Sequence, residues 1–338
     1  GPDPIQFPKI DRHPEPVSYA GLNTYSEPPK YDPNSTDTWQ MDLRSTDLSH
    51  LDLSQSRDDL FYATFDSKTV WPENMPADFD WQAFLETGKN PGLGIHSLHE
   101  QGITGQGIGI AIIDQALLVD HVEYKDRIRL YEEAEDVVGG WEEASMHGPA
   151  VASIAVGKTV GVAPSADLYF IATGDCGGAK NYEDFDFSCR ATAIQRIVEI
   201  NKSLPKNRKI RVLSMAFGWS PDSKGYDEIV AAVNEAKSNG IFVISSSIEE
   251  TYDFRFHGLG RDPLANPEDA ASYLPGSWWA GDFYTGKYEV LRLLVPMDSR
   301  TTASPNGYED YVFYRQGGWS WSIPYLAGMY ALAAQVKP

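Results

Sequence analysis

The sequence predicts an α/β protein in which a mostly parallel, doubly wound sheet carries helices on both faces. Two observations lead to this prediction. Short apolar runs with the length of buried strands alternate along the chain with longer segments whose apolar residues have helical spacing. Strands that alternate with helices are joined by crossovers, which place the strands parallel and the helices over both faces of the sheet.

Five segments are predicted to be strands and four to be helices. The strands are 107–114, 167–172, 209–216, 241–245 and 291–295. The helices are 147–157, 190–204, 226–238 and the segment that follows Ser320. In parallel sheets the catalytic and ligand-binding residues lie at the carboxyl ends of the strands. Asp114 and the serine run 245–247 lie at two such ends.

Composition limits the classes of partner. The 338 residues carry a net charge of −20, so nucleic acid and anionic membranes are not expected to bind. No run of 18 apolar residues is present, so no transmembrane segment is predicted. The hydrophobic share of 42% is sufficient for a large core. Cys176 and Cys189 could form a disulfide or stay as thiols, and the sequence does not decide between the two.

Two regions are expected. Residues 1–91 begin with a stretch rich in Pro, Ser and Asp, and we expect an extended arm that packs on the main domain of residues 92–338. A phrase Asp-Leu-Ser occurs at 47–49 and again at 52–54, and we attribute the repetition to chance because two copies cannot build a solenoid. The opening Gly-Pro resembles the remnant of a cleavage site, so a leader is expected to have preceded it.

Three residue types with complementary chemistry stand at the boundaries of predicted elements: Asp114 ends a strand, His147 begins a helix and Ser320 begins another. A serine becomes a strong nucleophile when a histidine takes its proton, and a carboxylate holds that histidine in one tautomer. Gly317 and Gly318 allow a close backbone approach before Ser320, and Pro324 is expected in the first helical turn. Taken alone, the segment around Ser320 is more typical of a glycine-serine turn before a core helix, and the rest of the chain changes this interpretation.

Five short stretches stand in a characteristic order along the chain. They are the aspartate strand 112–114 (IID), the histidine helix 146–153 (MHGPAVAS), 161–166 (GVAPSA), the strand 213–218 (LSMAFG) and the serine segment 318–324 (GWSWSIP). In this order they resemble motifs of the subtilisin-like (subtilase, S8) serine peptidases. Asp-His-Ser is also the chain order of subtilisin, unlike that of chymotrypsin or the α/β-hydrolases. The resemblance covers about residues 92–338 and implies a subtilisin-like fold.

The resemblance implies roles for particular residues. Asp114, His147 and Ser320 would be the catalytic residues, and Ala216, Phe217 and Gly218 would pair with an extended peptide substrate. The family's asparagine, which donates to the oxyanion, is replaced by Ile248. Three explanations stay open: a hydroxyl of Ser246 or Ser247 substitutes, a group from 251–290 reaches in, or turnover is slow. Glu249 and Glu250 form either a solvated turn or part of a specificity pocket that favours Lys or Arg.

The sequence also departs from the family's motifs around the histidine and the serine, and in the length of the segment where some members bind calcium. Ala150 stands where the family usually has a second histidine, and Trp319 and Trp321 flank the serine where smaller residues are usual. Gly161 follows His147 by 14 positions, which leaves no room for the family's inserted calcium loop, so Glu123 is not expected to hold calcium. No cofactor or metal is predicted.

The sequence therefore predicts a serine endopeptidase that acts on peptides or proteins and is secreted or located at the cell surface. One alternative is a non-catalytic or partner-activated subtilase-fold protein that binds peptides, because the oxyanion asparagine is missing. In that case a partner or a further C-terminal segment would complete the fold. A more distant alternative, an esterase of another fold, is disfavoured by the Asp-His-Ser order.

Overall fold

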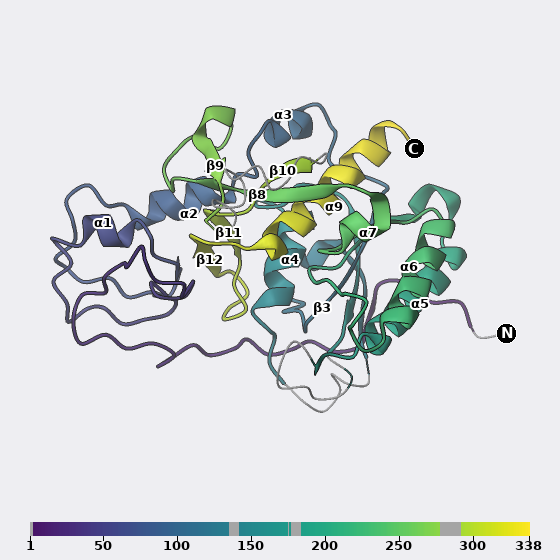
Figure 1. The fold of residues 1–338 in the computed structure, drawn as a ribbon, viewed down its shortest axis with the longest axis horizontal. Coiled ribbons are helices and arrows are strands. Elements are labelled where there is room, and N and C mark those ends of the chain that lie inside the picture. Colours follow the sequence, from purple (N-terminus) through teal and green to yellow (C-terminus); the bar gives the residue numbers. More distant parts are fainter. Residues whose placement is uncertain (1–2, 135–141, 175, 177–183, 278–291) are drawn as a thin grey trace.

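A parallel sheet of six strands forms the centre of the structure, a computed structural model that describes residues 3–134, 142–174, 176, 184–277 and 292–338 (Figure 1). In the described residues the strand order is β1-β4-β5-β3-β6-β7, and every neighbouring pair is parallel. The strands are β1 (Lys9–Ile10), β3 (Gly109–Asp114), β4 (Ile128–Glu133), β5 (Asp167–Ala172), β6 (Ile210–Ser214) and β7 (Phe242–Ile244).

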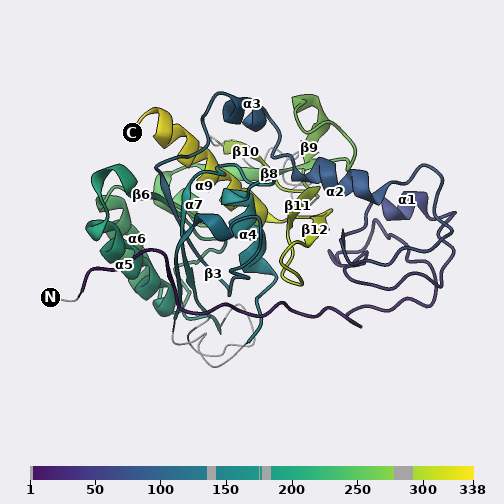
Figure 2. The same cartoon turned by 180° about the vertical axis from the view of Figure 1, so that it is seen from behind.

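Helices cover both faces of this sheet, which confirms the predicted fold class. One face packs against α4 (His147–Val156) and α9 (Trp319–Val336), and the other against α5 (Ser188–Ser203) and α6 (Tyr226–Ser238) (Figure 2). Alternate side chains of β3 enter the two cores: Ile110 and Ile112 join the α4–α9 side, and Ala111 and Ile113 join the α5–α6 side. A central strand buried on both faces is apolar along most of its length, and in β3 only the last residue, Asp114, is charged.

Four central strands and all four predicted helices lie where the sequence predicts them, within two residues at nearly every end. The last helix differs: it begins at Trp319, so Pro324 lies inside it and not in its first turn as expected. Strand β4 is not predicted, because charged residues interrupt its apolar pattern (IRLYEE).

Two three-stranded sheets lie next to α4 and α9. The first has the order β10-β8-β9, built from β8 (Arg255–Arg261), β9 (Tyr273–Pro275) and β10 (Arg292–Pro296). The second has the order β11-β12-β2, built from β2 (Phe65–Asp66), β11 (Arg300–Ala303) and β12 (Tyr311–Tyr314). Strand β10 corresponds to the predicted strand 291–295, and a short helix, α7 (Ile248–Tyr252), precedes β8.

The N-terminal residues contribute to both ends of the molecule. The first residues add β1 to the edge of the central sheet and then run to a lobe at the far end from α5 and α6, as both ribbon views show. This lobe contains α1 (Arg57–Leu60), β2 and α2 (Trp81–Lys89), and α3 (Ile95–Glu100) follows it. Its apolar cluster includes Phe65 and Phe84 and receives Phe313 from β12. Two sheets therefore contain strands from both sides of residue 92.

The Asp-Leu-Ser phrase belongs to a genuine five-residue structural repeat, so attributing it to chance is wrong. Leu43, Leu48 and Leu53 are all fully buried. Each leucine N–H donates to a second segment, at Thr64 O, Val70 O and Asn74 O over 2.8, 2.8 and 2.9 Å. The aspartate before each leucine (42, 47 and 52) accepts a hydrogen bond from the backbone N–H two residues on. The first copy reads Asp-Leu-Arg, which hides it from a search for the exact phrase.

Candidate active site

Asp114 and His147 meet at the edge of the central sheet. Asp114 is the last residue of β3, which lies between β5 and β6, where the chain order of the sheet reverses. Such a switch point leaves a crevice at the carboxyl ends of the strands. His147 is the first residue of α4, and its Nδ1 lies 2.7 Å from Asp114 Oδ1. The aspartate side chain is 3% exposed, and the histidine side chain is 23% exposed.

The aspartate alters the acid-base behaviour of the histidine. Burial lowers the pKa of His147, but the charge of Asp114 and its hydrogen bond raise the pKa by more, so the net direction is upward. Because Nδ1 faces the carboxylate, Nε2 is the nitrogen left for a reaction partner. The pair can therefore accept a proton at Nε2 and stabilise the resulting charge.

Ser320 is the second residue of α9, directly after a turn that requires glycine. Gly318 has φ +71°, and a Cβ on Gly317 would lie 1.9 Å from Met297 O. The Gly317 N–H donates to Asp298 Oδ1 over 2.9 Å, and Asp298 is 3% exposed. Burial raises the pKa of this carboxyl, although the N–H groups of Gly317 and Ser277 oppose the shift. Asp298, which the sequence reasoning did not find, thus fixes the turn before Ser320.

Trp321 connects the serine segment with the histidine. Its ring centroid lies 5.5 Å from that of His147, and the ring is buried. Ser320 directly precedes Trp321 in α9. No hydrogen bond joins Ser320 to His147 in the part of the chain that the structure describes. The structure thus brings Asp114 and His147 into contact, with Ser320 adjacent to a residue that packs on the imidazole.

A cleft of about 200 Å³ opens beside this pair. Asp114 and His147 line it together with Ala216 and Phe217, two of the residues predicted to bind substrate. The cleft also contains four residues that the sequence reasoning missed: Gln115, Thr173, Phe185 and Arg190. Gln115 and Thr173 follow β3 and β5 directly, so their positions at strand ends were the available signal. The Arg190 guanidinium lies 4.9 Å from the centroid of the Phe217 ring.

Gly218, Ser246 and Ser247 form a tight junction behind the cleft. A Cβ on Gly218 would lie 2.9 Å from Ser246 Cβ, so only glycine fits there without a shift. The Ser246 N–H donates to Phe217 O over 2.9 Å. The Ser247 hydroxyl donates to Trp219 O and accepts from Trp219 N–H, over 2.8 and 2.9 Å. Its proton is already in use, which weakens Ser247 as an oxyanion donor.

Neither Glu249 nor Ile248 lines the cleft beside His147. The carboxylate of Glu249, on α7, is 2.5 Å from Arg255 Nε, and Glu250 accepts a hydrogen bond from the Tyr226 hydroxyl. Neither glutamate lines the cleft beside His147. Ile248 is 2% exposed and belongs to the main core. The structure therefore does not place Glu249 in the cleft with Ala216 and Phe217.

Comparison with known sequences identifies the family. The profile of the Subtilase family of peptidases (Peptidase_S8) matches residues 105–279, which is more than half of the chain. The chain belongs to the subtilase family. A curated relative, the major intracellular serine protease of Bacillus subtilis (strain 168), is 26% identical over 243 residues, 69% of this chain and 70% of that protein.

Solved structures similar to this subtilase include three proteases of low identity. The prenylagaramide maturation protease PagA is 14% identical, with a TM-score of 0.47, covering 72% of this chain and 81% of that one. The PatG macrocyclase domain is 16% identical, with a TM-score of 0.47, covering 72% and 82%. A cold adapted subtilisin-like serine proteinase is 15% identical, with a TM-score of 0.44, covering 69% and 77%.

The curated relative is described as intracellular, so the predicted secretion of this subtilase receives no support from it and stays a prediction. Among the described residues, no helix combines the length and the apolar character needed to cross a bilayer.

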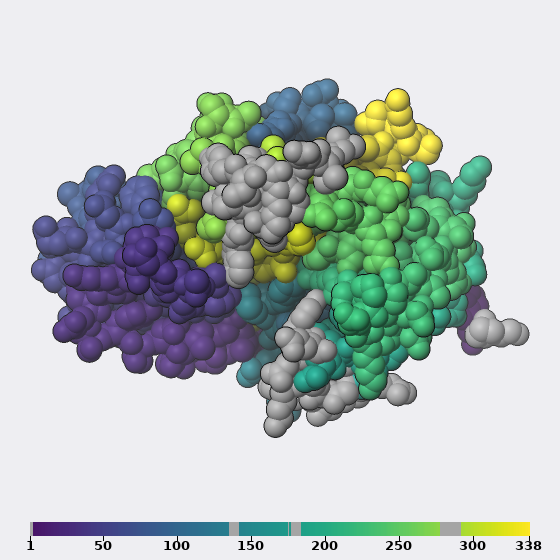
Figure 3. Space-filling view, in the orientation of Figure 1, coloured from purple at the N-terminus to yellow at the C-terminus, as the bar shows by residue number. Residues whose placement is uncertain are grey.

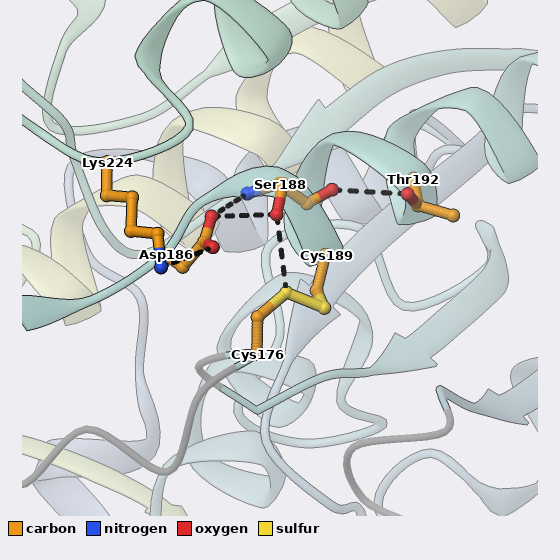
Figure 4. The surroundings of a disulfide bond; sticks show 6 residues. All are labelled: Cys176, Asp186, Ser188, Cys189, Thr192 and Lys224. Atoms are coloured by element: carbon orange, nitrogen blue, oxygen red, sulfur yellow. Dashed lines mark hydrogen bonds and ion pairs between the residues drawn. A yellow bond between two sulfur atoms is a disulfide. The ribbon is translucent and has the colours of Figure 1, made fainter.

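A disulfide bond lies next to a residue that lines the cleft of the subtilase. Cys176 and Cys189 are bonded, with their Cα atoms 5.6 Å apart, which settles the choice that the sequence left open (Figure 4). Beside the bond, Asp186 accepts hydrogen bonds from the Ser188 N–H and hydroxyl, over 2.9 and 2.7 Å. The bond ties the chain after β5 to the first turn of α5, next to Arg190 of the cleft.

Glu123 has protein partners for its carboxylate oxygens. It is 2% exposed and accepts from Thr159 N–H and the Tyr311 hydroxyl, each over 2.8 Å, and from the Thr159 hydroxyl. Within the described ranges, no group of three or more His, Cys, Asp or Glu side chains is arranged to hold a metal. The absence of a metal or other cofactor stays a prediction.

Proposed function

We propose that this subtilase is a serine endopeptidase that uses Asp114, His147 and Ser320 as a catalytic triad. The observation that carries the proposal is the 2.7 Å hydrogen bond between Asp114 Oδ1 and His147 Nδ1, made at a cleft that also contains Ala216 and Phe217. A buried carboxylate behind a partly exposed histidine is the arrangement that a general base needs.

The reaction follows from these positions. Ser320 Oγ attacks the peptide carbonyl carbon while its proton passes to His147 Nε2, and Asp114 stabilises the imidazolium. The C–N bond then breaks, and the imidazolium gives the proton to the leaving amine, leaving an acyl-enzyme. Water attacks the acyl carbon and gives a proton to His147. The proton returns to Ser320 Oγ as the carboxylic acid leaves.

Oxyanion stabilisation is assigned to one donor. The Ser320 N–H stands at the start of α9, where backbone N–H groups have no partner within the helix. A second donor is not assigned: Ile248 is apolar, and the Ser247 proton is already donated to Trp219 O. Ser246 remains a candidate, and part of 251–290 lies outside the described residues. Loss of one such donor costs about 10²–10³ in turnover, so a slow enzyme is expected if none substitutes.

Substrate recognition is assigned to the edge formed by Ala216, Phe217 and Gly218. An extended peptide can add to such an edge through backbone hydrogen bonds, while side chains enter neighbouring pockets. In this proposal residues 92–338 constitute the peptidase unit and residues 1–91 pack on it. Glu249, paired with Arg255, has weaker support as a binding residue.

Labelling with a fluorophosphonate probe tests the proposal. The wild type should become labelled at Ser320, as mapped by mass spectrometry, and should cleave a casein substrate. Ser320→Ala should do neither. Ser26→Ala, a change at an exposed serine, is the matched control and should behave like the wild type.

The competing proposal is a subtilase-fold protein that binds peptides without cleaving them, which the missing asparagine favours. Absence of labelling and of cleavage in a folded wild type would support that function and overturn the triad.

A further inference from the structure

A second cavity lies next to the cleft and is closed on one side by the N-terminal arm. It has a volume of about 500 Å³. Val17 and Tyr19 of the arm form one wall. The opposite wall includes residues that flank two of the three members of the proposed triad: Gln115 and Ala116 follow Asp114, and Ser145 and Met146 precede His147. Neither the family motifs nor the composition indicated that the arm takes part in a site.

The cavity continues from the cleft beside His147. Gln115 and Thr173 line both spaces, so they form a shared border. A peptide bound in the cleft would therefore pass the mouth of this cavity. In the space-filling view most of the purple N-terminal residues lie at the left end of the molecule, beside residues of the C-terminal segment in yellow, while the start of the chain lies at the right (Figure 3).

The arm is held firmly on both sides of the cavity. Glu15 pairs with the chain before His147: its N–H donates to Glu142 O, and the Ala144 N–H donates to Glu15 O, each over 2.9 Å. The Val17 N–H donates to Pro305 O over 2.9 Å. The Arg44 guanidinium lies 5.1 Å from the centroid of the Tyr19 ring.

The opposite wall is fixed in the same way, since the Ser145 N–H donates to Ala116 O over 3.0 Å. Both walls are thus in place before a ligand binds, which reduces the entropy lost on binding.

The lining selects for an apolar group. Val17, Ala116, Met146 and the ring of Tyr19 give the lining apolar surface, and Glu143 is the charged side chain among the lining residues. A glutamate there disfavours acidic groups by repulsion. The volume lies within the range of pockets that hold small organic groups.

We propose that this cavity receives a large apolar side chain of the peptide substrate, so that the N-terminal arm is part of the substrate-recognition site. The inference rests on the proposed peptidase function. It assigns Val17 and Tyr19 to specificity and not to chemistry, because they contact the proposed ligand and not the reacting atoms.

Two variants change the cavity in opposite directions. Tyr19→Ala removes the ring from one wall, and Val17→Trp fills the space while keeping the backbone hydrogen bond to Pro305. Tyr25→Ala is the matched control: it removes a tyrosine from the same arm that belongs to the apolar cluster of the N-terminal lobe. All three changes are made in the full chain.

The test profiles kcat/KM with peptides in which one position at a time is Ala, Leu or Phe. The wild type should prefer Leu or Phe over Ala at one position, and Tyr19→Ala and Val17→Trp should each reduce that preference about 10-fold. Tyr25→Ala should keep the preference of the wild type. An active wild type whose preference is the same in Tyr19→Ala, Val17→Trp and Tyr25→Ala would overturn the inference.

Binding in the Ser320→Ala background separates this inference from the proposed function. Fluorescence anisotropy with labelled Leu, Phe and Ala peptides reports occupancy without turnover. A tighter affinity for the large side chain that disappears with Tyr19→Ala supports the cavity assignment even if the wild type neither cleaves nor labels. Equal affinities for the three peptides would overturn the assignment even if the wild type is an active peptidase.

Discussion

Asp114 holds His147 from behind, with Oδ1 2.7 Å from Nδ1. This contact fixes which imidazole nitrogen carries the proton in the neutral ring, because Nδ1–H donates to the carboxylate. Nε2 is left with a lone pair for a proton from Ser320. The rate of the proposed reaction should therefore depend on the carboxylate of Asp114.

Replacing Asp114 by Asn tests this dependence. The amide keeps the shape but removes the charge and favours the wrong tautomer, so kcat should fall about 10⁴-fold. The change is measured by steady-state hydrolysis of a peptide substrate. Asp120→Asn is the control, because Asp120 pairs with His13 at the surface and lines neither cavity described above. A fall of less than tenfold for Asp114→Asn would contradict the assigned role.

The pH dependence of kcat/KM follows from the raised pKa of His147. The base must be neutral, so activity should rise with pH through a midpoint above the ordinary value of 6.5. The same shift stabilises the fold at pH values below the ordinary pKa, and this contribution is lost as pH rises through the raised pKa. A profile of kcat/KM from pH 5 to 9 checks the midpoint, with His13→Gln as the control. A midpoint at or below 6.5 would contradict the raised pKa.

Asp298 should position Ser320 through the preceding turn. Asp298→Ala leaves the Gly317 N–H without its acceptor and frees the turn, so kcat should fall about 100-fold. KM should change little, since Asp298 does not line the cleft. Asp298→Asn keeps an oxygen acceptor and should recover most of the activity. Equal losses in the Ala and Asn variants would show that the carboxylate acts in another way.

Most of the central sheet could be predicted because its strands and helices have strong local patterns. Strand β3 is apolar at nearly every position, and α4 and α9 are rich in small apolar residues. Asp114 and His147 could be predicted because each stands at the boundary of such an element. Their 2.7 Å contact could only be expected from the order of residues in the chain.

The features that escaped prediction depend on contacts between distant segments. Strand β1 is two residues long and is defined by its pairing with β4. The sequence left the Ser247 hydroxyl as a candidate oxyanion donor, because its hydrogen-bond partner, Trp219 O, lies 28 residues away in the chain and no local pattern indicates it. Glu249 is paired with Arg255 on the next strand, which no local pattern indicates. The leucine repeat becomes visible only when the second segment, 64–74, is seen to pair with it.

Glu123 should contribute to stability through its buried hydrogen bonds. Glu123→Ala leaves the Tyr311 hydroxyl and the Thr159 N–H without their acceptor, and the free energy of unfolding should fall by about 1–3 kcal/mol. Urea denaturation measures the change. Glu27→Gln, a change at an exposed glutamate, should leave the midpoint unchanged. Equal midpoints for the two variants would show that these bonds contribute nothing net.

The leucine repeat should stabilise the N-terminal lobe and, through β12, the serine segment. Leu48 is fully buried, so Leu48→Ala should lower the free energy of unfolding by about 2–5 kcal/mol. Leu22→Ala is the matched control, because Leu22 is 49% exposed and should change stability by less than about 0.5 kcal/mol.

Phe313 of β12 lies in the same apolar cluster as Leu48, and Gly317 and Gly318 follow that strand before Ser320. In Leu48→Ala, two signals are therefore followed against urea concentration: labelling of Ser320 by the fluorophosphonate, and tryptophan fluorescence as the measure of folding. Both should be lost at the same urea concentration. Labelling that persists after the lobe has unfolded would show that the lobe and the serine segment are energetically independent.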